Sequence, residues 1–408
     1  MTGCRDDEHR RRRGERILQE LSDLLHEPEF YAGDPFPALA RLRREAPVLH
    51  NERTGYWALT RHRDVHEVSR DNTTFVSGYG VLYAHFTPER QEHPGSLLSA
   101  DPPLHTYYRR ILWEAFTPSK IRGLEPAIRA RAVALLDAVD RGGVTEFVHD
   151  IAVPFPLIVL ADLMGLPADD WEEYCEWMDA AVRTSNVGAA DEDKARVQEM
   201  RVFLLEKVAE HRGSGIPGAI TMLADHEDDR GTLDERQLLM FLLQLFIAGN
   251  ETTRNTISGG LVAFSQHPDQ WARLRADRSL VDTAVEEILR WTTSVLHFCR
   301  TAAVDTEIDG HPVAAGDKIL MSYLSANFDE EVFGPTADRF DVGRTPDPQL
   351  SFGFGGHFCL GAALARLEVR VMLEELLDRF ETIEPAGEVV RIPNVAIRGI
   401  GQAPLRFS

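Results

Sequence analysis

The segment SFGFGGHFCLG, residues 351–361, surrounds a single thiol, Cys359, with glycines and aromatic rings. A phosphate-binding loop would need Lys and then Ser or Thr after its last glycine, whereas Gly361 is followed by two alanines. Zinc would need about four ligands, and no second pair with metal-ligand spacing accompanies His357 and Cys359. A cysteine nucleophile with His357 as its base and a buried free cysteine in a glycine-rich turn both remain open.

The surroundings of Cys359 also suit a further chemistry. We expect this residue at the start of an apolar helix, where amide N–H groups and the helix dipole favour an ionised sulfur. The glycines let the backbone bend close to the sulfur, and the phenylalanines exclude water. An anionic sulfur that is hydrogen-bonded yet dry suits the axial ligation of haem iron.

The composition sets limits on the function. The chain has 408 residues, of which 43% are hydrophobic and 27% charged, as in ordinary globular proteins. The net charge of −21 argues against general binding to nucleic acid or to anionic membranes, because both require basic surface. The four cysteines are scattered, which indicates a reducing cytoplasm. The longest apolar run, residues 238–249, is shorter than the ~20 residues that span a bilayer, so we expect no membrane anchor.

The pattern along the chain predicts a mainly α fold with a small β-rich region (α+β). Residues 1–14 are expected to be a disordered tail, followed by one domain over 15–408. The longest helix is expected to begin at GTLDERQ, where Thr232 and Glu235 have the spacing of a capping box. Its first half is apolar almost all round and must be buried, yet Ala248–Thr253 (AGNETT) interrupts it with weak helix formers.

The string FGFGGHFCLG resembles the haem-binding signature of the cytochrome P-450 family, and the resemblance covers most of residues 30–408. The amino-acid sequence is similar to that of soluble bacterial members of the family. The resemblance implies one prism-shaped domain around a buried haem b (iron protoporphyrin IX), with the thiolate of Cys359 as the axial metal ligand. It implies cofactor contacts from nine residues: His105, Arg109, Ala248, Arg300, Phe352, Gly353, His357, Cys359 and Gly361.

Four of these residues match donors to the haem propionates. The string DPPLHTYYRR places His105 and Arg109 four apart on one helix face. Without the resemblance, this would be an ordinary surface helix after an Asp-Pro-Pro turn. In the family these side chains grip the propionates, because charge-assisted hydrogen bonds suit carboxylates, and Arg300 and His357 match further donors.

Glu287 and Arg290, in EEILRW, have a spacing that several surface pairs of this chain share, so the spacing alone indicates little. Their position before the β-rich region matches the family's buried pair. The resemblance implies Arg344 as a third member of a network that braces the proximal side of the haem, a structural role.

The resemblance also gives AGNETT a role. Glu251 and Thr252 match the family's catalytic acid–alcohol pair, which delivers protons during oxygen activation. Gly249 would leave space for dioxygen beside the helix. The alternative is a polar kink in which the threonine hydroxyl bonds the carbonyl four residues earlier.

The resemblance places the substrate over the distal haem face. A mostly apolar pocket would suit a lipophilic substrate. Two departures from the family pattern are Gln349, where His is common, and Ser294, where Pro is common. The candidate pocket walls are Val81, Leu82, Tyr83, Phe86, Leu97, Leu98, Leu245, Ala248, Val295, Leu296 and Ile400.

We therefore expect a haem-thiolate monooxygenase that hydroxylates an unactivated C–H bond of a steroid, terpenoid, branched lipid or polyketide-like molecule. No flavin- or NAD-binding motif is visible, so the resemblance implies electrons from an iron–sulfur ferredoxin and its reductase, with Arg110 and Arg366 on the docking face. We expect a monomer. A peroxide-driven enzyme of the same fold and a non-catalytic haem sensor are the alternatives.

Overall fold

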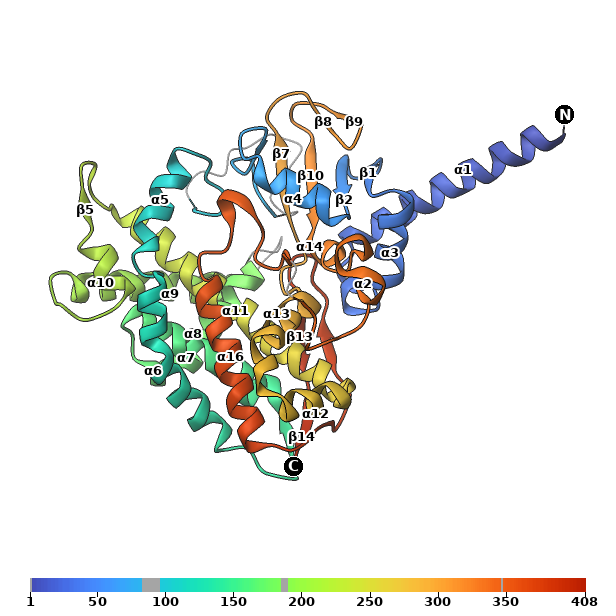
Figure 1. The fold of residues 1–408 in the computed structure, drawn as a ribbon. Helices are drawn as coiled ribbons and strands as arrows, with labels where there is room; N and C mark the ends of the chain where they lie inside the picture. The colour runs from blue at the N-terminus through green and yellow to red at the C-terminus, as the bar shows by residue number, and fades with distance from the viewer. Residues whose placement is uncertain (1, 83–95, 185–189, 346–347) are drawn as a thin grey trace.

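The computed structural model describes residues 2–82, 96–184, 190–345 and 348–408, except for the side chains of 2–12 and 182. Helices fill the lower and left parts of the molecule, and the largest sheet stands at the top (Figure 1). The predicted mainly α fold with a small β region is confirmed. The α-helices are α1 (Thr2–Asp23), α2 (Pro28–Ala32), α3 (Phe36–Glu45), α4 (His62–Arg70), α5 (Leu104–Trp113), α6 (Pro118–Leu136), α7 (Pro154–Met164), α8 (Trp171–Thr184), α9 (Asp191–His211), α10 (Ala219–Ala224), α11 (Glu235–Gln266), α12 (Pro268–Ala276), α13 (Val281–Thr292), α14 (Tyr323–Ala326), α15 (Glu330–Phe333) and α16 (Ala362–Arg379).

The strands join segments that are far apart in the sequence. The largest sheet has the order β1-β2-β10-β7-β3, and a smaller one has the order β11-β14-β4. β10 runs parallel to β2, with Leu320 opposite Ala58, and antiparallel to β7. The strands are β1 (Val48–Asn51), β2 (Tyr56–Leu59), β3 (Phe75–Val76), β4 (Val144–Glu146), β5 (Glu227–Asp228), β6 (Gly231–Thr232), β7 (His297–Ala302), β8 (Thr306–Ile308), β9 (His311–Val313), β10 (Lys318–Ser322), β11 (Ile383–Pro385), β12 (Val390–Ile392), β13 (Gly399–Gln402) and β14 (Pro404–Phe407).

Helix α11 is the longest helix of the described chain, with 32 residues, and it carries many of the fully buried side chains of the largest hydrophobic cluster. It spans roughly 48 Å at ~1.5 Å per residue. Helices α7, α13 and α16 all pack against it. No helix in the described ranges has both the length and the apolar character needed to cross a bilayer.

The start of α11 corrects the predicted capping box. The box consists of Asp234 and Gln237: Asp234 Oδ1 accepts the N–H of Gln237 at 2.7 Å, and Gln237 Oε1 accepts the N–H of Asp234 at 3.0 Å. Thr232 instead ends the short β5–β6 hairpin, where it pairs with Glu227. The prediction from Thr232 and Glu235 was wrong because the hairpin keeps the chain extended for two more residues.

The N-terminal segment forms a long helix. Helix α1 runs without a break from Thr2 to Asp23 and projects away from the body (Figure 1), and the disordered tail over residues 1–14 stays a prediction. Arginine and glutamate are good helix formers, and the helix continues into a packed part. There Leu18 and Leu21 lie against a cluster that contains Leu25 and Tyr31. The expected boundary at residue 15 therefore falls inside a helix.

The cap of α11 gives a matched prediction. Asp234→Ala should lower the free energy of unfolding by about 1 kcal/mol, because the backbone N–H of Gln237 loses its side-chain acceptor. Thr232→Ala, which removes no cap, should change it by less than about 0.5 kcal/mol. Urea unfolding followed by circular dichroism measures both values. An equal loss in the two variants would contradict this assignment of the cap.

Candidate functional site

The loop that carries Cys359 is fixed by backbone geometry. The N–H of Cys359 donates to the carbonyl of Phe352 at 2.9 Å, which closes the loop. Gly353 and Gly355 have φ of 66° and 73°, in the left-handed region that favours glycine. A Cβ on Gly355 would also collide with the carbonyl oxygen of Ser69 in α4. The glycines are therefore required for the close approach of the loop to α4.

The sulfur of Cys359 lies just before α16, not within it. The helix begins at Ala362, with Gly361 as its N-cap, so the expected helix start at Cys359 is three residues too early. Burial raises the pKa of the Cys359 thiol, although the N–H of Gly361 and the charges of Arg109 and Arg366 oppose the shift. The protein surroundings alone therefore favour the neutral thiol, and a bound metal ion would be needed to deprotonate it outright.

The four predicted propionate donors come together from three elements. His105 and Arg109 lie on α5, Arg300 on β7, and His357 in the 3₁₀ turn Gly355–His357. The rings of His105 and His357 have centroids 4.1 Å apart. Burial and the charge of Arg300 lower the pKa of His357, and His105 and Arg109 add to the shift. These side chains form a donor cluster of two arginines and two neutral histidines.

The donor cluster fits an anionic group such as the two haem propionates. Buried His105 Nε2 has no hydrogen-bond partner within the described residues. Asp101 is near His105 and Arg300, but its oxygens accept the N–H groups of Ser77 and Gly78, each at 2.8 Å. Buried cations and unpaired donors cost free energy unless they are paired, so this cluster suits carboxylates supplied by a cofactor.

His357 is oriented toward this cluster. Its Nε2 lies 3.2 Å from the hydroxyl of Ser77. The alternative in which His357 acts as the base for a Cys359 nucleophile therefore has no support in the geometry.

Midway along α11, apolar residues are exposed where the helix should be most buried. Ile247 is 42% exposed and Ala248 is also exposed, although Leu245 and Phe246 beside them are buried. This helix face therefore borders a hollow inside the fold, as a haem site requires. A Cβ on Gly249 would contact Leu160 of α7 at 3.5 Å. A side chain at position 249 would therefore point toward α7, and the role of Gly249 in leaving space for dioxygen stays a prediction.

The hydroxyl of Thr252 donates to the carbonyl of Ala248 at 2.9 Å, the bond of a polar helical kink. A hydroxyl that donates one bond can still accept another, so this contact leaves Thr252 able to take part in proton transfer. Ala248 and Thr252 lie four residues apart, on the same face of α11.

Glu251 sits in a partly buried ion pair. Its Oε1 lies 3.6 Å from Nη2 of Arg254, one turn along α11, and its side chain is 19% exposed. Burial raises the pKa of the Glu251 carboxyl, Arg254 opposes the shift, and Asp179 of α8 adds to it. Glu251 therefore holds a proton more readily than an exposed glutamate, as a general acid near neutral pH should.

Two residues that sequence reasoning missed hold the backbone of Thr252. The hydroxyls of Thr256 and Ser294 both donate to the carbonyl of Thr252, at 2.8 and 3.0 Å. Ser294 was noted as a departure from the family pattern, and this contact gives it a role that proline could not supply. The role of Ser294 could have been predicted from a hydroxyl residue at a position expected to lie opposite the polar segment of the helix.

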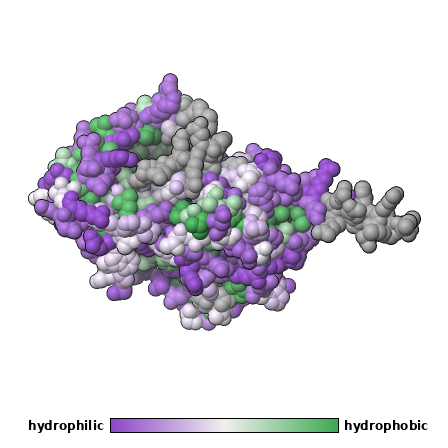
Figure 2. All heavy atoms as spheres, turned by 90° about the horizontal axis from the view of Figure 1, so that it is seen from above, coloured by the Kyte–Doolittle hydropathy of each residue, from purple (hydrophilic) through white to green (hydrophobic). Residues whose placement is uncertain are grey.

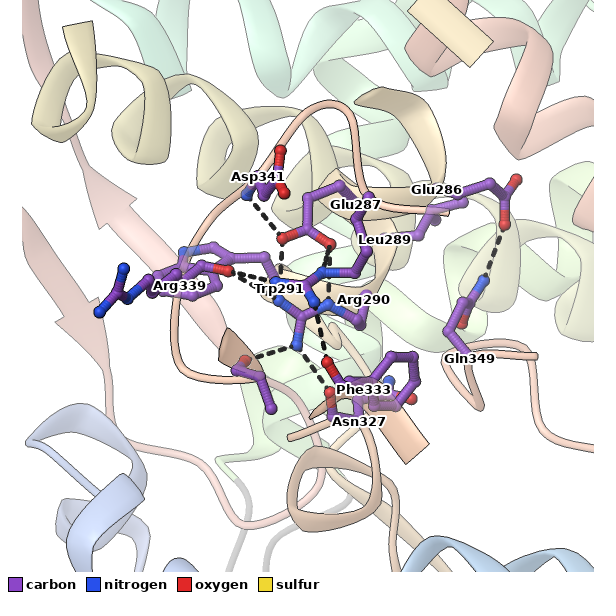
Figure 3. Close-up of polar contacts among 12 residues, drawn as sticks. Glu286, Glu287, Leu289, Arg290, Trp291, Asn327, Phe333, Arg339, Asp341 and Gln349 are labelled. Carbon is purple, nitrogen blue, oxygen red and sulfur yellow. Dashed lines mark hydrogen bonds and ion pairs between the residues drawn. The ribbon is translucent and has the colours of Figure 1, made fainter. Parts of the chain in front are cut away.

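Glu287, Arg290 and Arg344 form a buried network. Figure 3 shows Glu287 and Arg290 within it. Arg290 Nε and Nη2 donate to the two carboxylate oxygens of Glu287, each at 2.8 Å. Arg290 Nη1 donates to the carbonyls of Asn327 and Ala337. Arg344 Nε donates to Glu287 at 3.0 Å. Each charge is thus paired inside the core, which is the condition under which burial is tolerated.

The neighbouring Glu286 supports the cysteine loop itself. The amide of Gln349 donates to Glu286 at 3.3 Å, while its carbonyl oxygen accepts the N–H of Ser351 (Figure 3). Glu286 also accepts Nη2 of Arg366 at 3.1 Å, and that guanidinium lies over the ring of Phe352. Gln349, a departure from the family pattern, therefore helps to fix the start of the loop.

The predicted pocket residues fall into different surroundings. Leu97 and Leu245 belong to the largest cluster, whereas Leu296 packs beside Leu25 and Tyr31 in a separate one. The surface seen from above is hollowed, with hydrophobic residues at the margin (Figure 2).

The remaining candidates are placed as follows. Ile400 packs with Val148 and Val262, so it belongs to the core. Val81 is fully buried, and its carbonyl accepts the N–H of Cys299. Leu82, Leu98 and Val295 are partly buried, and Tyr83 and Phe86 lie outside the described residues.

Known proteins are similar to this chain in architecture and in sequence. The family model for cytochrome P450 matches residues 191–407. Linalool 8-monooxygenase from Pseudomonas putida is 37% identical over 92% of this chain and 96% of that enzyme. Steroid C26-monooxygenase from Mycolicibacterium smegmatis is 34% identical over 90% of this chain and 89% of that enzyme. A solved cytochrome P450 from Chondromyces apiculatus superposes with a TM-score of 0.83 and 35% identity, covering 93% of this chain and 97% of the other.

The chain belongs to the cytochrome P450 family. It is a haem-dependent monooxygenase, with haem b bound through a cysteine thiolate.

The assignment of Cys359 as that ligand is tested by substitution. Cys359→Ser should abolish the red-shifted Soret band that the reduced carbon monoxide complex of a thiolate-ligated haem shows, because an alcohol is a weaker donor. Cys299→Ala, which changes another buried cysteine, should keep the band. Retention of the band in Cys359→Ser would exclude this cysteine as the ligand.

The buried network gives a second prediction. Glu287→Gln should lower the free energy of unfolding of the haem-loaded enzyme by about 3–5 kcal/mol, because it leaves two guanidinium groups without a counter-charge. Glu199→Gln breaks an exposed pair with Arg196 at the same three-residue spacing and should cost less than about 1 kcal/mol. Urea unfolding of both variants measures the difference, and similar losses would argue against the network.

Proposed function

We propose that this cytochrome P450 hydroxylates an unactivated C–H bond of a lipophilic steroid, terpenoid, branched lipid or polyketide-like molecule. The acid–alcohol pair Glu251–Thr252, beside the exposed Ala248 in the middle of the buried helix α11, is the observation that carries the proposal. The names of similar enzymes support the substrate class: linalool 8-monooxygenase, steroid C26-monooxygenase and methyl-branched lipid omega-hydroxylase.

The side chains around the haem would divide the work. The bound haem supplies the activation of dioxygen, and the donor cluster of His105, Arg109, Arg300 and His357 would hold its propionates. The protonated carboxyl of Glu251 would pass a proton inward, and the hydroxyl of Thr252 would receive and orient it. The hydroxyls of Thr256 and Ser294 would keep the Thr252 backbone in place while this happens.

A ferredoxin is the electron donor that we propose, docking near α5. A groove of about 470 Å³ there is lined by Arg109, Arg110 and Trp113. Trp113 is 46% exposed, which suits an apolar contact with a partner. Arg366 is already paired with Glu286, whereas Arg110 is well exposed and 3.4 Å from Asp228. Arg110 is therefore the better candidate for steering an acidic protein. We also propose that the enzyme is a monomer and works in a reducing cytoplasm.

Turnover tests the proposed function. A lipophilic compound that displaces the sixth iron ligand in spectral titrations should yield a hydroxylated product when a ferredoxin and its reductase supply electrons. Thr252→Ala should lower the yield of product per electron by about 10²-fold, as expected for loss of one proton-transfer group, while Thr252→Ser should restore most of it. Product and electron consumption are measured together.

The alternatives give different results. Full turnover with hydrogen peroxide alone, and no effect of Thr252→Ala, would support the peroxide-driven enzyme. Ligand binding without product under every electron donor would support the haem sensor. An unchanged yield per electron in Thr252→Ala would refute the proton-transfer role of Thr252.

A further inference from the structure

Gln244 on α11 has an amide orientation that the structure fixes. Its Oε1 accepts the backbone N–H of Leu97 at 3.0 Å and so ties the turn at residues 96–100 to the central helix. A backbone N–H can only donate, so the atom that faces it must be the amide oxygen. The NH₂ group of Gln244 therefore points away from Leu97.

Within the residues that the structure describes, Gln244 forms one hydrogen bond, and its Oε1 makes that bond to Leu97. The NH₂ group therefore has no partner among the described residues. Gln244 is partly buried. It lies four residues before Ala248 and eight before Thr252, so the three residues share one face of α11. Ala248 and its neighbour Ile247 are exposed within the fold, which places Gln244 beside the same hollow.

We propose that the NH₂ group of Gln244 recognises an acceptor oxygen of the substrate, an inference that rests on the proposed function. Because the amide oxygen is occupied by Leu97, Gln244 can only donate to a ligand. The favoured substrates are therefore lipophilic molecules that carry a ketone, ester, ether or hydroxyl oxygen, in preference to hydrocarbons of the same shape. An analogue without the oxygen leaves the amide unpaired in an apolar pocket, which weakens its binding.

The position of Gln244 also sets where the substrate is oxidised. Eight residues along a helix separate the backbones of Gln244 and Thr252 by roughly 12 Å at ~1.5 Å per residue, so the recognised oxygen is expected toward the end of the pocket away from Thr252. The oxidised carbon is therefore at the end of the molecule remote from the acceptor oxygen.

The binding test compares geranylacetone with the hydrocarbon in which a methylene replaces its carbonyl. Spectral titration of the haem enzyme gives both dissociation constants. In Gln244→Leu, the preference for the ketone relative to the hydrocarbon should fall about tenfold from its value in the unaltered enzyme, the effect of one neutral hydrogen bond. Using a ratio cancels the different hydrophobicity of the two compounds.

Gln244→Glu at pH 8 is the matched control for the loop. It keeps an oxygen for the N–H of Leu97 but replaces the donor, so it should lose the ketone preference as Gln244→Leu does. A preference that survives in Gln244→Glu would assign the effect to the tether of Leu97 and overturn the proposal, as would a preference unchanged in both variants. These outcomes leave the hydroxylase function intact, because that function requires only that the compounds bind and are oxidised.

The product of geranylacetone gives an independent readout. Hydroxylation at the dimethyl end, far from the carbonyl, is expected. Hydroxylation on the carbons next to the carbonyl would overturn the placement of the acceptor oxygen at Gln244, yet it would still be hydroxylation of a lipophilic compound. Mass spectrometry and NMR of the product distinguish the two positions.

Discussion

The burial of one sulfur is the constraint on which the site depends. Around Cys359 the loss of water outweighs the help from the Gly361 N–H and from Arg109 and Arg366, so the pKa of the thiol is raised. An ionised cysteine is favoured by exposure to water or by nearby positive charge. This structure supplies a rigid loop instead, and a bound haem iron would favour the ionised sulfur. The protein contributes a fixed backbone conformation of the loop, which depends on the left-handed φ of Gly353 and Gly355.

The charges near the cofactor site are arranged in two contrasting ways. On the side of Glu287, each buried charge has a protein partner, and the network holds the segment 327–344 that leads to the cysteine loop. Among the described residues around His105 and Arg300, donors gather, and the carboxylate of Asp101 already accepts two backbone N–H groups. The first arrangement is paired within the protein, whereas the second suits an anionic group such as the haem propionates that we expect there. On this assignment, separate groups of residues would stabilise the framework and hold the haem.

The sequence predicted the elements better than their ends. Helix α11 and the β-rich region follow from periodicity, which is a local property of the sequence. The cap at Asp234 was missed because a hairpin of two short strands extends the chain just before it. The roles of Gln244 and Ser294 depend on partners 147 and 42 residues away, in Leu97 and Thr252. Contacts between residues so far apart cannot be predicted from a local sequence pattern. A resemblance to a family indicates roles only for the positions that its members have in common.

The sheet β11-β14-β4 has a consequence for how the enzyme is made. Its central strand, Pro404–Phe407, follows both of its neighbours in the sequence, and it joins residues 144–146 to residues 383–385. During synthesis residues 144–146 emerge from the ribosome long before the central strand, and residues 383–385 emerge shortly before it. Phe147 and Phe380 then lack Phe407, the ring that each contacts in the finished fold. Completion of this core must therefore wait until Pro404–Phe407 has been synthesised, and the nascent chain exposes aromatic surface that chaperones can bind until then.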